Sequence, residues 1–186
     1  MSNYQGLFEE AVRRTARVGA VAPSVTYAAG RNYLSQEAYD RFPYYVQKAI
    51  GDLDFPDVVA QCLSIHYRLK EPLEEFFGCN VFYTIGWVEH QTGRNMFEFD
   101  EHYAEQLLVK KHRPGGTVNM HAWLTLPSME IIDVALATSI GFAQDRPEMY
   151  GAVVAKHADE LTGGMAYRPM LVGEDYLLKT GLAKVV

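Results

Sequence analysis

Apolar side chains in the first part of the chain recur at helical spacing. Residues 4–17 place apolar side chains between charged ones, which predicts a short amphipathic helix. A second helix is predicted over 36–50, because Ser35 can cap its start and large apolar side chains then fall on roughly one side. Pro43 predicts a break within that helix, since proline removes a backbone hydrogen bond. Residues 19–30 have no steady period and are predicted to form a loop.

The third predicted helix carries the first cysteine of the chain. Its start is expected at Asp54 or Asp57, because aspartate is favoured at helix caps. The apolar positions continue through Cys62, and Gly78 is expected to end the helix. A start near Asp57 would place Cys62 more than one turn inside the helix. Pro72 is expected to kink or restart it.

From Cys79 onward the pattern becomes mostly that of strands, with β-branched and aromatic residues in short runs. Helices first and strands afterwards indicate an α+β fold rather than alternating βαβ units. The predicted elements are a strand over 81–88, a helix over 99–111, strands over 120–126 and 130–136, a loop over 138–148, a hairpin of 151–158 with 165–172, and a helix over 174–180.

The chain shows no internal repeat or linker, so we predict a single domain over residues 1–186. Within it we expect a helical N-terminal part over 1–50, a catalytic core over 54–136, and a C-terminal hairpin and helix over 137–186. The segments 1–50 and 138–186 are expected to wall the substrate cleft.

Composition narrows the classes of partner. Lys and Arg total 17 and Asp and Glu total 23, which gives a net charge of −6 and disfavours nucleic acid binding. The apolar stretches are short and interrupted, so no membrane span is expected. The first residues lack the pattern of a secretory signal, and two cysteines exclude a disulfide framework. A cytoplasmic protein is therefore expected, although export without a cleaved signal would leave the same pattern.

Three residues suggest a thiol-based site. Cys62 lies in a helix, His121 in a strand, and Asp133 in the next strand. If those strands form a hairpin centred on Pro127, His121 and Asp133 lie directly opposite one another, with Cβ atoms about 5 Å apart. The carboxylate would then hold one imidazole nitrogen while the other faces the thiol, which is the arrangement that activates a cysteine nucleophile.

The same residues, with their surroundings, resemble a known superfamily. The chain is similar to the transglutaminase-like branch of the papain-like thiol enzymes, in which a helix with a nucleophilic cysteine packs on an antiparallel β-sheet. The resemblance covers roughly residues 57–136. It is carried by the helix from Cys62 to Gly78, the strand Phe82–Val88, the His-Ala-Trp strand His121–Leu126, and the apolar segment Ile131–Asp133.

The resemblance implies an activity and a role for each residue. Cys62 would be the nucleophile, His121 the general base and acid, and Asp133 the residue that orients the histidine, with Trp123 packed beneath the site. Gln61 is a candidate donor to the oxyanion. Such enzymes form a thioester with an amide or ester carbonyl and pass the acyl group to water or to an amine. The substrate would be a protein, a peptide or a small acyl compound, and no metal or organic cofactor is needed.

Other interpretations remain open at the level of sequence. Cys79 with the same histidine forms a rival pair, although Cys79 would lie on a strand without support from a helix. His66 follows Cys62 by four residues and is a fallback base, or else a residue of the helix surface. Further histidines lack the spacing of a helical zinc motif and are interpreted as exposed loop residues: His90, His102 and His112. A non-catalytic binding or scaffold module with the same fold is the alternative function.

Overall fold

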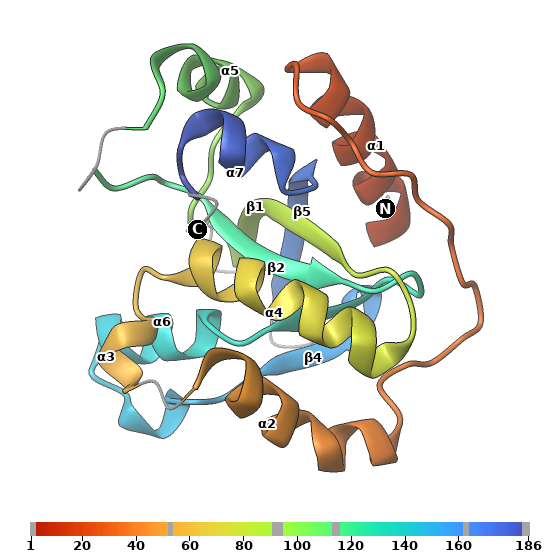
Figure 1. Cartoon of the computed structure of the whole chain (residues 1–186). Coiled ribbons are helices and arrows are strands. Elements are labelled where there is room, and N and C mark those ends of the chain that lie inside the picture. The colour runs from red at the N-terminus through yellow and green to blue at the C-terminus, as the bar shows by residue number, and fades with distance from the viewer. Residues whose placement is uncertain (1–2, 52–53, 91–94, 113–115, 162–163, 184–186) are drawn as a thin grey trace. The chain divides into compact units, whose positions relative to one another are not determined.

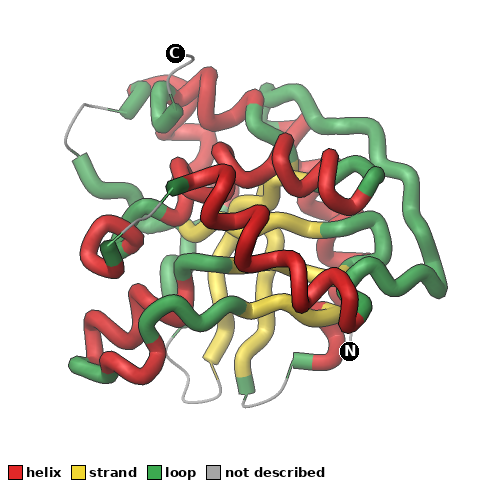
Figure 2. The backbone as a smooth tube through the Cα atoms, turned by 60° about the horizontal axis from the view of Figure 1, so that its bottom comes forward, coloured by secondary structure: helices red, strands yellow, loops and turns green. Residues whose placement is uncertain are grey.

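The computed structural model describes residues 3–51, 54–90, 95–112, 116–161 and 164–183. Figure 1 labels most of the helices and strands, and Figure 2 shows where helices, strands and loops follow one another along the backbone. Helices and antiparallel strands occur together, so the predicted α+β class is confirmed. The finer papain-like architecture stays a prediction. The chain forms two compact units: the first unit comprises Met1–Ser24, Tyr83–Ala122 and Ala158–Val186, and the second comprises Val25–Phe82 and Trp123–His157.

The first unit is built on an antiparallel pair of strands. The strands run side by side from Thr84↔Val172 to His90↔Met165, with one irregularity after Ile85. Its elements are α1 (Tyr4–Arg17), β1 (Phe82–His90, whose first residue belongs to the second unit), α5 (Glu101–Lys110), the 3-10 turn η2 (Ala158–Glu160), β5 (Met165–Val172) and α7 (Asp175–Thr180).

Helix α1 has the bounds that the sequence predicted. The Asn3 side chain accepts a hydrogen bond from the Gly6 backbone N–H at 3.0 Å and so caps the helix start. Near the other end of the helix, the buried Thr15 hydroxyl oxygen accepts the Val172 N–H at 2.8 Å. This bond fixes α1 on β5, and the buried Phe8 adds apolar contact area to the same helix face.

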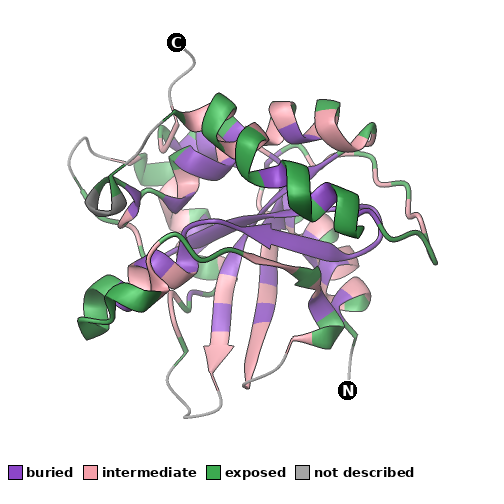
Figure 3. Cartoon of the chain, turned by 90° about the horizontal axis from the view of Figure 1, so that it is seen from below, coloured by how far each residue is buried: buried purple, intermediate pink, exposed green. Residues whose placement is uncertain are grey.

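The second unit combines helices with a three-stranded antiparallel arrangement. Strand β3 pairs with β2 on one side and with β4 on the other. Both β2 and β3 are buried at every position (Figure 3). Helix α2 packs against α4, and α3 against α6. The elements are α2 (Gln36–Ile50), α3 (Phe55–Val58), α4 (Cys62–Phe77), β2 (His121–Thr125, whose first two residues belong to the first unit), β3 (Glu130–Asp133), α6 (Leu136–Gln144), the 3-10 turn η1 (Pro147–Met149) and β4 (Val154–His157).

The predicted start of the third helix is wrong, because two helices replace one. Helix α3 ends at Val58, and the Gln61 N–H closes a turn on the Val58 carbonyl at 3.1 Å. Ala60 lies between the two helices with φ at +60°, in the left-handed region that a helix cannot contain. Helix α4 then begins at Cys62. The cysteine is therefore the first residue of a helix, not an interior one.

The predicted break at Pro43 and the predicted restart at Pro72 are both wrong, because neither proline ends its helix. Helix α2 is continuous through Pro43, and α4 is continuous through Pro72. Each proline removes one backbone N–H, and the packing on either side compensates: Phe42 in α2 and Leu69 and Leu73 in α4 are buried. The predicted ends are confirmed elsewhere, since Ser35 caps α2 and Gly78 ends α4 in the left-handed conformation.

The C-terminal part pairs differently from the prediction. The segment 151–158 contains β4, which pairs with β3, whereas the segment 165–172 forms β5 and pairs with β1. The predicted hairpin of these two segments is therefore wrong, because each strand finds a partner distant in sequence. The segment 138–148, predicted as a loop, contains most of α6 and the start of η1.

Candidate functional site

Cys62 occupies the N-terminus of α4, directly after the left-handed turn. The thiol side chain is buried, with 7% of the residue exposed. The Ile65 N–H donates to the Gln61 carbonyl at 2.9 Å, which makes Gln61 the residue that opens the helix. Backbone N–H groups in the first helical turn point away from the helix and create a region favourable to negative charge. A thiolate or an oxyanion at this position would benefit from that field.

Gln61 is exposed, and its side chain is held by α4 itself. The Ser64 hydroxyl donates to Gln61 Oε1 at 2.9 Å and lies 3.1 Å from the Gln61 carbonyl oxygen. Because the amide oxygen accepts from Ser64, the amide nitrogen of Gln61 carries the donors that the predicted oxyanion role requires. The structure therefore places Gln61 beside the nucleophile candidate and orients its side chain.

His66 lies one turn further along α4 and is completely buried. Its Nδ1 is 2.8 Å from the Cys62 carbonyl oxygen, and its Nε2 is 3.1 Å from the Val134 backbone N–H. A carbonyl accepts and an amide N–H donates, so Nδ1 must carry the proton and Nε2 must be the acceptor. His66 is thus a neutral bridge between α4 and the residue after β3. This role makes His66 a poor fallback base for the thiol.

Asp133 ends β3 and is also completely buried. Its Oδ1 accepts the backbone N–H groups of Ala135 at 2.9 Å and Leu136 at 3.0 Å, which satisfies two donors at the start of α6. The same oxygen lies 3.6 Å from His66 Nε2, too far for a hydrogen bond. The structure thus places Asp133 and His66 close together in the second unit, with Asp133 fixed by the backbone.

The hairpin that carries Asp133 has a different register from the predicted one. Leu124 pairs with Ile132 and Thr125 with Ile131, so the turn is centred on residue 128. Continued by one pair, this register sets Trp123 opposite Asp133, where His121 was predicted. The cause is a three-residue loop in which Met129 has φ at +68° and donates its N–H to the Leu126 carbonyl. Trp123 is completely buried.

His121 is the first residue of β2 and belongs to the first unit, whereas Cys62 and Asp133 belong to the second. Only 1% of His121 is exposed. Its ring stacks on Phe97, with centroids 5.1 Å apart and planes at 20°, and Tyr167 lies 6.5 Å away. Two aromatic side chains therefore define the orientation of the imidazole, in a setting that sequence spacing did not reveal.

Cys79 occupies a different environment from Cys62. It is partly exposed and follows Gly78 after the end of α4. Burial raises the pKa of the Cys79 thiol, and a hydrogen bond with Tyr33 opposes this effect. The charged form is therefore disfavoured at neutral pH. Cys79 is a useful internal comparison for the reactivity of Cys62.

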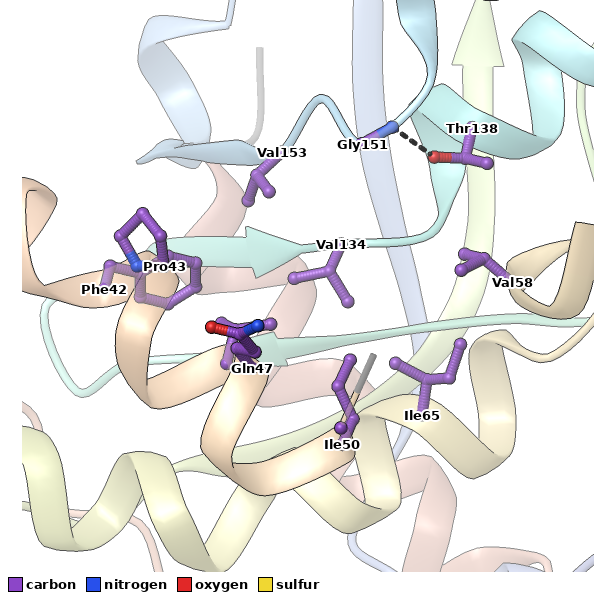
Figure 4. Close-up of a pocket in the computed structure, with 12 residues that line it drawn as sticks. Phe42, Pro43, Gln47, Ile50, Val58, Ile65, Val134, Thr138, Gly151 and Val153 are labelled. Atoms are coloured by element: carbon purple, nitrogen blue, oxygen red, sulfur yellow. Dashed lines mark hydrogen bonds between the residues drawn. The ribbon is translucent and has the colours of Figure 1, made fainter. Parts of the chain in front are cut away.

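A cavity of about 340 Å³ lies within the second unit (Figure 4). Ile65 contributes from α4, three residues after Cys62, and Val134 contributes from the position after Asp133. Two residues of the cavity wall are therefore direct chain neighbours of buried residues of the candidate site: Ile65 precedes His66, and Val134 follows Asp133. The full lining comprises Phe42, Pro43, Val46, Gln47, Ile50, Gly51, Val58, Ile65, Val134, Thr138, Gly151 and Val153.

The segments 1–50 and 138–186 were expected to wall a substrate cleft, and both contribute residues to this cavity. The apolar positions of α2 recur at helical spacing and were predicted to fall on one side of that helix. The opposite wall includes Thr138, which was predicted to lie in a loop and lies instead in α6. The signal that would have indicated α6 is Asp133, which lies three residues before its first residue and caps the helix with its carboxylate.

Among the residues that the structure describes, no group of three or more His, Cys, Asp or Glu side chains is arranged to hold a metal ion. None of the helices in this part of the chain combines the length and apolar character required to cross a membrane.

Comparison of the chain with protein-family models, with curated proteins and with solved structures gave no match.

Proposed function

We propose that this chain is a thiol-dependent enzyme that hydrolyses or transfers an acyl group, with Cys62 as its nucleophile. The observation that carries the proposal is the position of Cys62 as the first residue of the 16-residue helix α4. The sequence pattern left this cysteine more than a turn inside a helix, where the favourable field of the N-terminus is lost. Its position at the start of the helix agrees with the arrangement that the resemblance implies.

The turn before Cys62 supports the same proposal. Ala60 adopts a left-handed conformation that costs a non-glycine residue free energy, and the turn directs Gln61 and Cys62 into the helix start. Strained backbone of this kind concentrates at functional sites. It is a reason to look for chemistry at Cys62 rather than at Cys79, which follows the end of the same helix.

The proposed reaction begins when the Cys62 thiol gives its proton to His121 and its sulfur attacks a carbonyl carbon of an amide or ester. The carbonyl oxygen becomes an oxyanion, which the amide of Gln61 and N–H groups at the start of α4 would stabilise. The carbon then expels its amine or alcohol, to which His121 gives a proton, and a thioester remains on Cys62. Water or an amine attacks the thioester and loses a proton to His121, which frees the thiol.

Alkylation by iodoacetamide at several pH values, followed by peptide mapping, tests the nucleophile. We expect Cys62 to react faster than Cys79 at pH values near 6.5, and His121→Ala to remove that difference. His102→Ala is the matched control, because His102 is an exposed residue of α5. Equal rates at the two cysteines, or reaction of Cys62 only after unfolding, would exclude Cys62 as an activated nucleophile.

A non-catalytic binding module is the second candidate function. It is favoured by the hydrogen bonds that His66 and Asp133 form with backbone groups, because these bonds stabilise the second unit without any catalytic role. The apolar cavity beside them would then be the binding site. The two candidates differ in one measurable property, since a binding module does not need a reactive Cys62.

A further inference from the structure

The cavity in the second unit begins beside the proposed nucleophile. Ile65 lines the cavity and follows Cys62 by three residues in α4. Residues at this spacing lie on the same face of a helix, with Cβ atoms about 5–6 Å apart. Val58, at the end of α3, lines the cavity just before the turn that leads to Cys62. A substrate attacked at Cys62 would therefore have this cavity within reach of its next few atoms.

The lining selects for an uncharged, apolar group. Ten of the lining positions described above are apolar or glycine, and the polar side chains among them are those of Gln47 and Thr138. The Thr138 hydroxyl oxygen accepts the Gly151 N–H at 3.0 Å, so it is already engaged within the wall (Figure 4). A charged group placed here would lose its hydration without an ionic partner among these residues.

The shape selects for a flexible chain. Side chains of Ile50, Ile65, Val58 and Val134 converge on the same space (Figure 4), and Phe42 supplies the aromatic ring of the lining. Apart from the Phe42 ring, the walls are mostly branched aliphatic side chains, which favour a flexible chain over a planar ligand. A water molecule takes about 30 Å³ of liquid and a methylene group takes a similar volume, so a space of about 340 Å³ holds roughly ten such groups.

We propose that this cavity binds the aliphatic chain of the acyl group that Cys62 accepts, so that the substrates are neutral acyl esters of medium chain length. This inference rests on the proposed function. In the first step the sulfur forms a bond to the carbonyl carbon, the bond to the ester oxygen breaks, and the departing alcohol receives the proton that the Cys62 thiol gave to His121. The thioester then has its carbonyl at the start of α4 and its chain in the cavity.

The experiment compares p-nitrophenyl esters of acetate, butyrate, hexanoate and octanoate as substrates of the full chain. We expect kcat/KM to rise about fourfold for each methylene that enters the cavity. Val153→Phe should reduce kcat/KM for the octanoate ester by about fifteenfold and flatten the dependence on chain length, because the lost space excludes about two methylenes. Val153 lines the cavity and is 40% exposed, so the larger side chain can be tolerated. Val109→Phe in α5, at 83% exposure, is the matched control.

A binding measurement separates this inference from the proposed function. In Cys62→Ser protein, N-methylhexanamide should raise the melting temperature and N-methylacetamide should not, and Val153→Phe should remove the effect. The cavity assignment is overturned if kcat/KM does not depend on chain length and N-methylhexanamide does not bind. If iodoacetamide still modifies Cys62 rapidly in that case, the proposed thiol enzyme stands without the cavity assignment. An inert Cys62 overturns the acyl-donor assignment even when N-methylhexanamide binds, and favours the binding module. Equal effects of Val153→Phe and Val109→Phe also overturn it.

Discussion

Replacement of Ala60 by glycine should stabilise the protein, which is unusual for an Ala→Gly change. Ala60 has φ at +60°, and its side chain is exposed, so no packing is lost when the methyl group is removed. The left-handed conformation costs a non-glycine residue roughly 1–2 kcal/mol. Glycine offsets part of that gain, because its unfolded state is more flexible by about 0.4–1 kcal/mol. We therefore expect Ala60→Gly to raise the free energy of unfolding by about 0.5–1 kcal/mol.

Urea denaturation of matched variants measures this effect. With a denaturant dependence of about 2 kcal/mol per molar urea, the midpoint should rise by roughly 0.3–0.5 M. Ala16→Gly is the control: Ala16 is exposed inside α1, where the same change should cost about 0.5–1 kcal/mol. Ala60→Val should also destabilise, since β-branched residues disfavour positive φ. If Ala60→Gly destabilises as Ala16→Gly does, the helix continues through Ala60 and Cys62 does not begin α4.

Two further substitutions test single interactions, a buried hydrogen bond in the second unit and an ion pair in the first. His66→Phe keeps a ring in the buried site but leaves the Val134 N–H without its acceptor, so urea denaturation should show a loss of about 1–3 kcal/mol; an unchanged midpoint would argue against the bridge. In the first unit, the hydrogen bond from Arg17 lowers the pKa of the Glu101 carboxyl below its ordinary value of 4.5. A lowered folded pKa stabilises the protein above the unfolded value and loses that effect as the pH falls through the folded one. Arg17→Ala should therefore reduce stability at pH 7 and approach the wild type in acid, and a difference that persists in acid would contradict the ion pair.

Local signals predicted those parts of the fold that depend on neighbouring residues. The bounds of α1 and α2 follow from residues within one or two turns, such as Ser35, whose side chain accepts the Ala38 N–H. Gly78 ended α4 as predicted because glycine adopts the left-handed conformation at little cost. In each case the residue that determines the structure lies inside the segment that it determines.

The sequence-based predictions failed where a structural feature depends on residues distant in sequence, or where no characteristic residue type marks the feature. Alanine is not typical of left-handed turns, so the sequence contains no indication that α3 and α4 are separate helices. The pairing of β5 with β1 depends on residues about eighty positions apart, and a sequence offers the nearby β4 as an equally good partner. Helix α6 begins because the Asp133 carboxylate accepts two N–H groups at its start, although its own residues include weak helix formers.

The hairpin of β2 and β3 shows why residue spacing alone does not determine which side chains meet. A left-handed Met129 lengthens the turn, and the centre moves by one residue. The residue opposite Asp133 is then two positions further along the chain, Trp123 instead of His121. Because side chains alternate with a period of two, such an error changes the partner of a residue but not the face on which it lies. The order of cysteine, histidine and aspartate along the chain is therefore a firmer basis for the proposed enzyme than their calculated alignment. The decisive observation is whether His121→Ala slows the alkylation of Cys62.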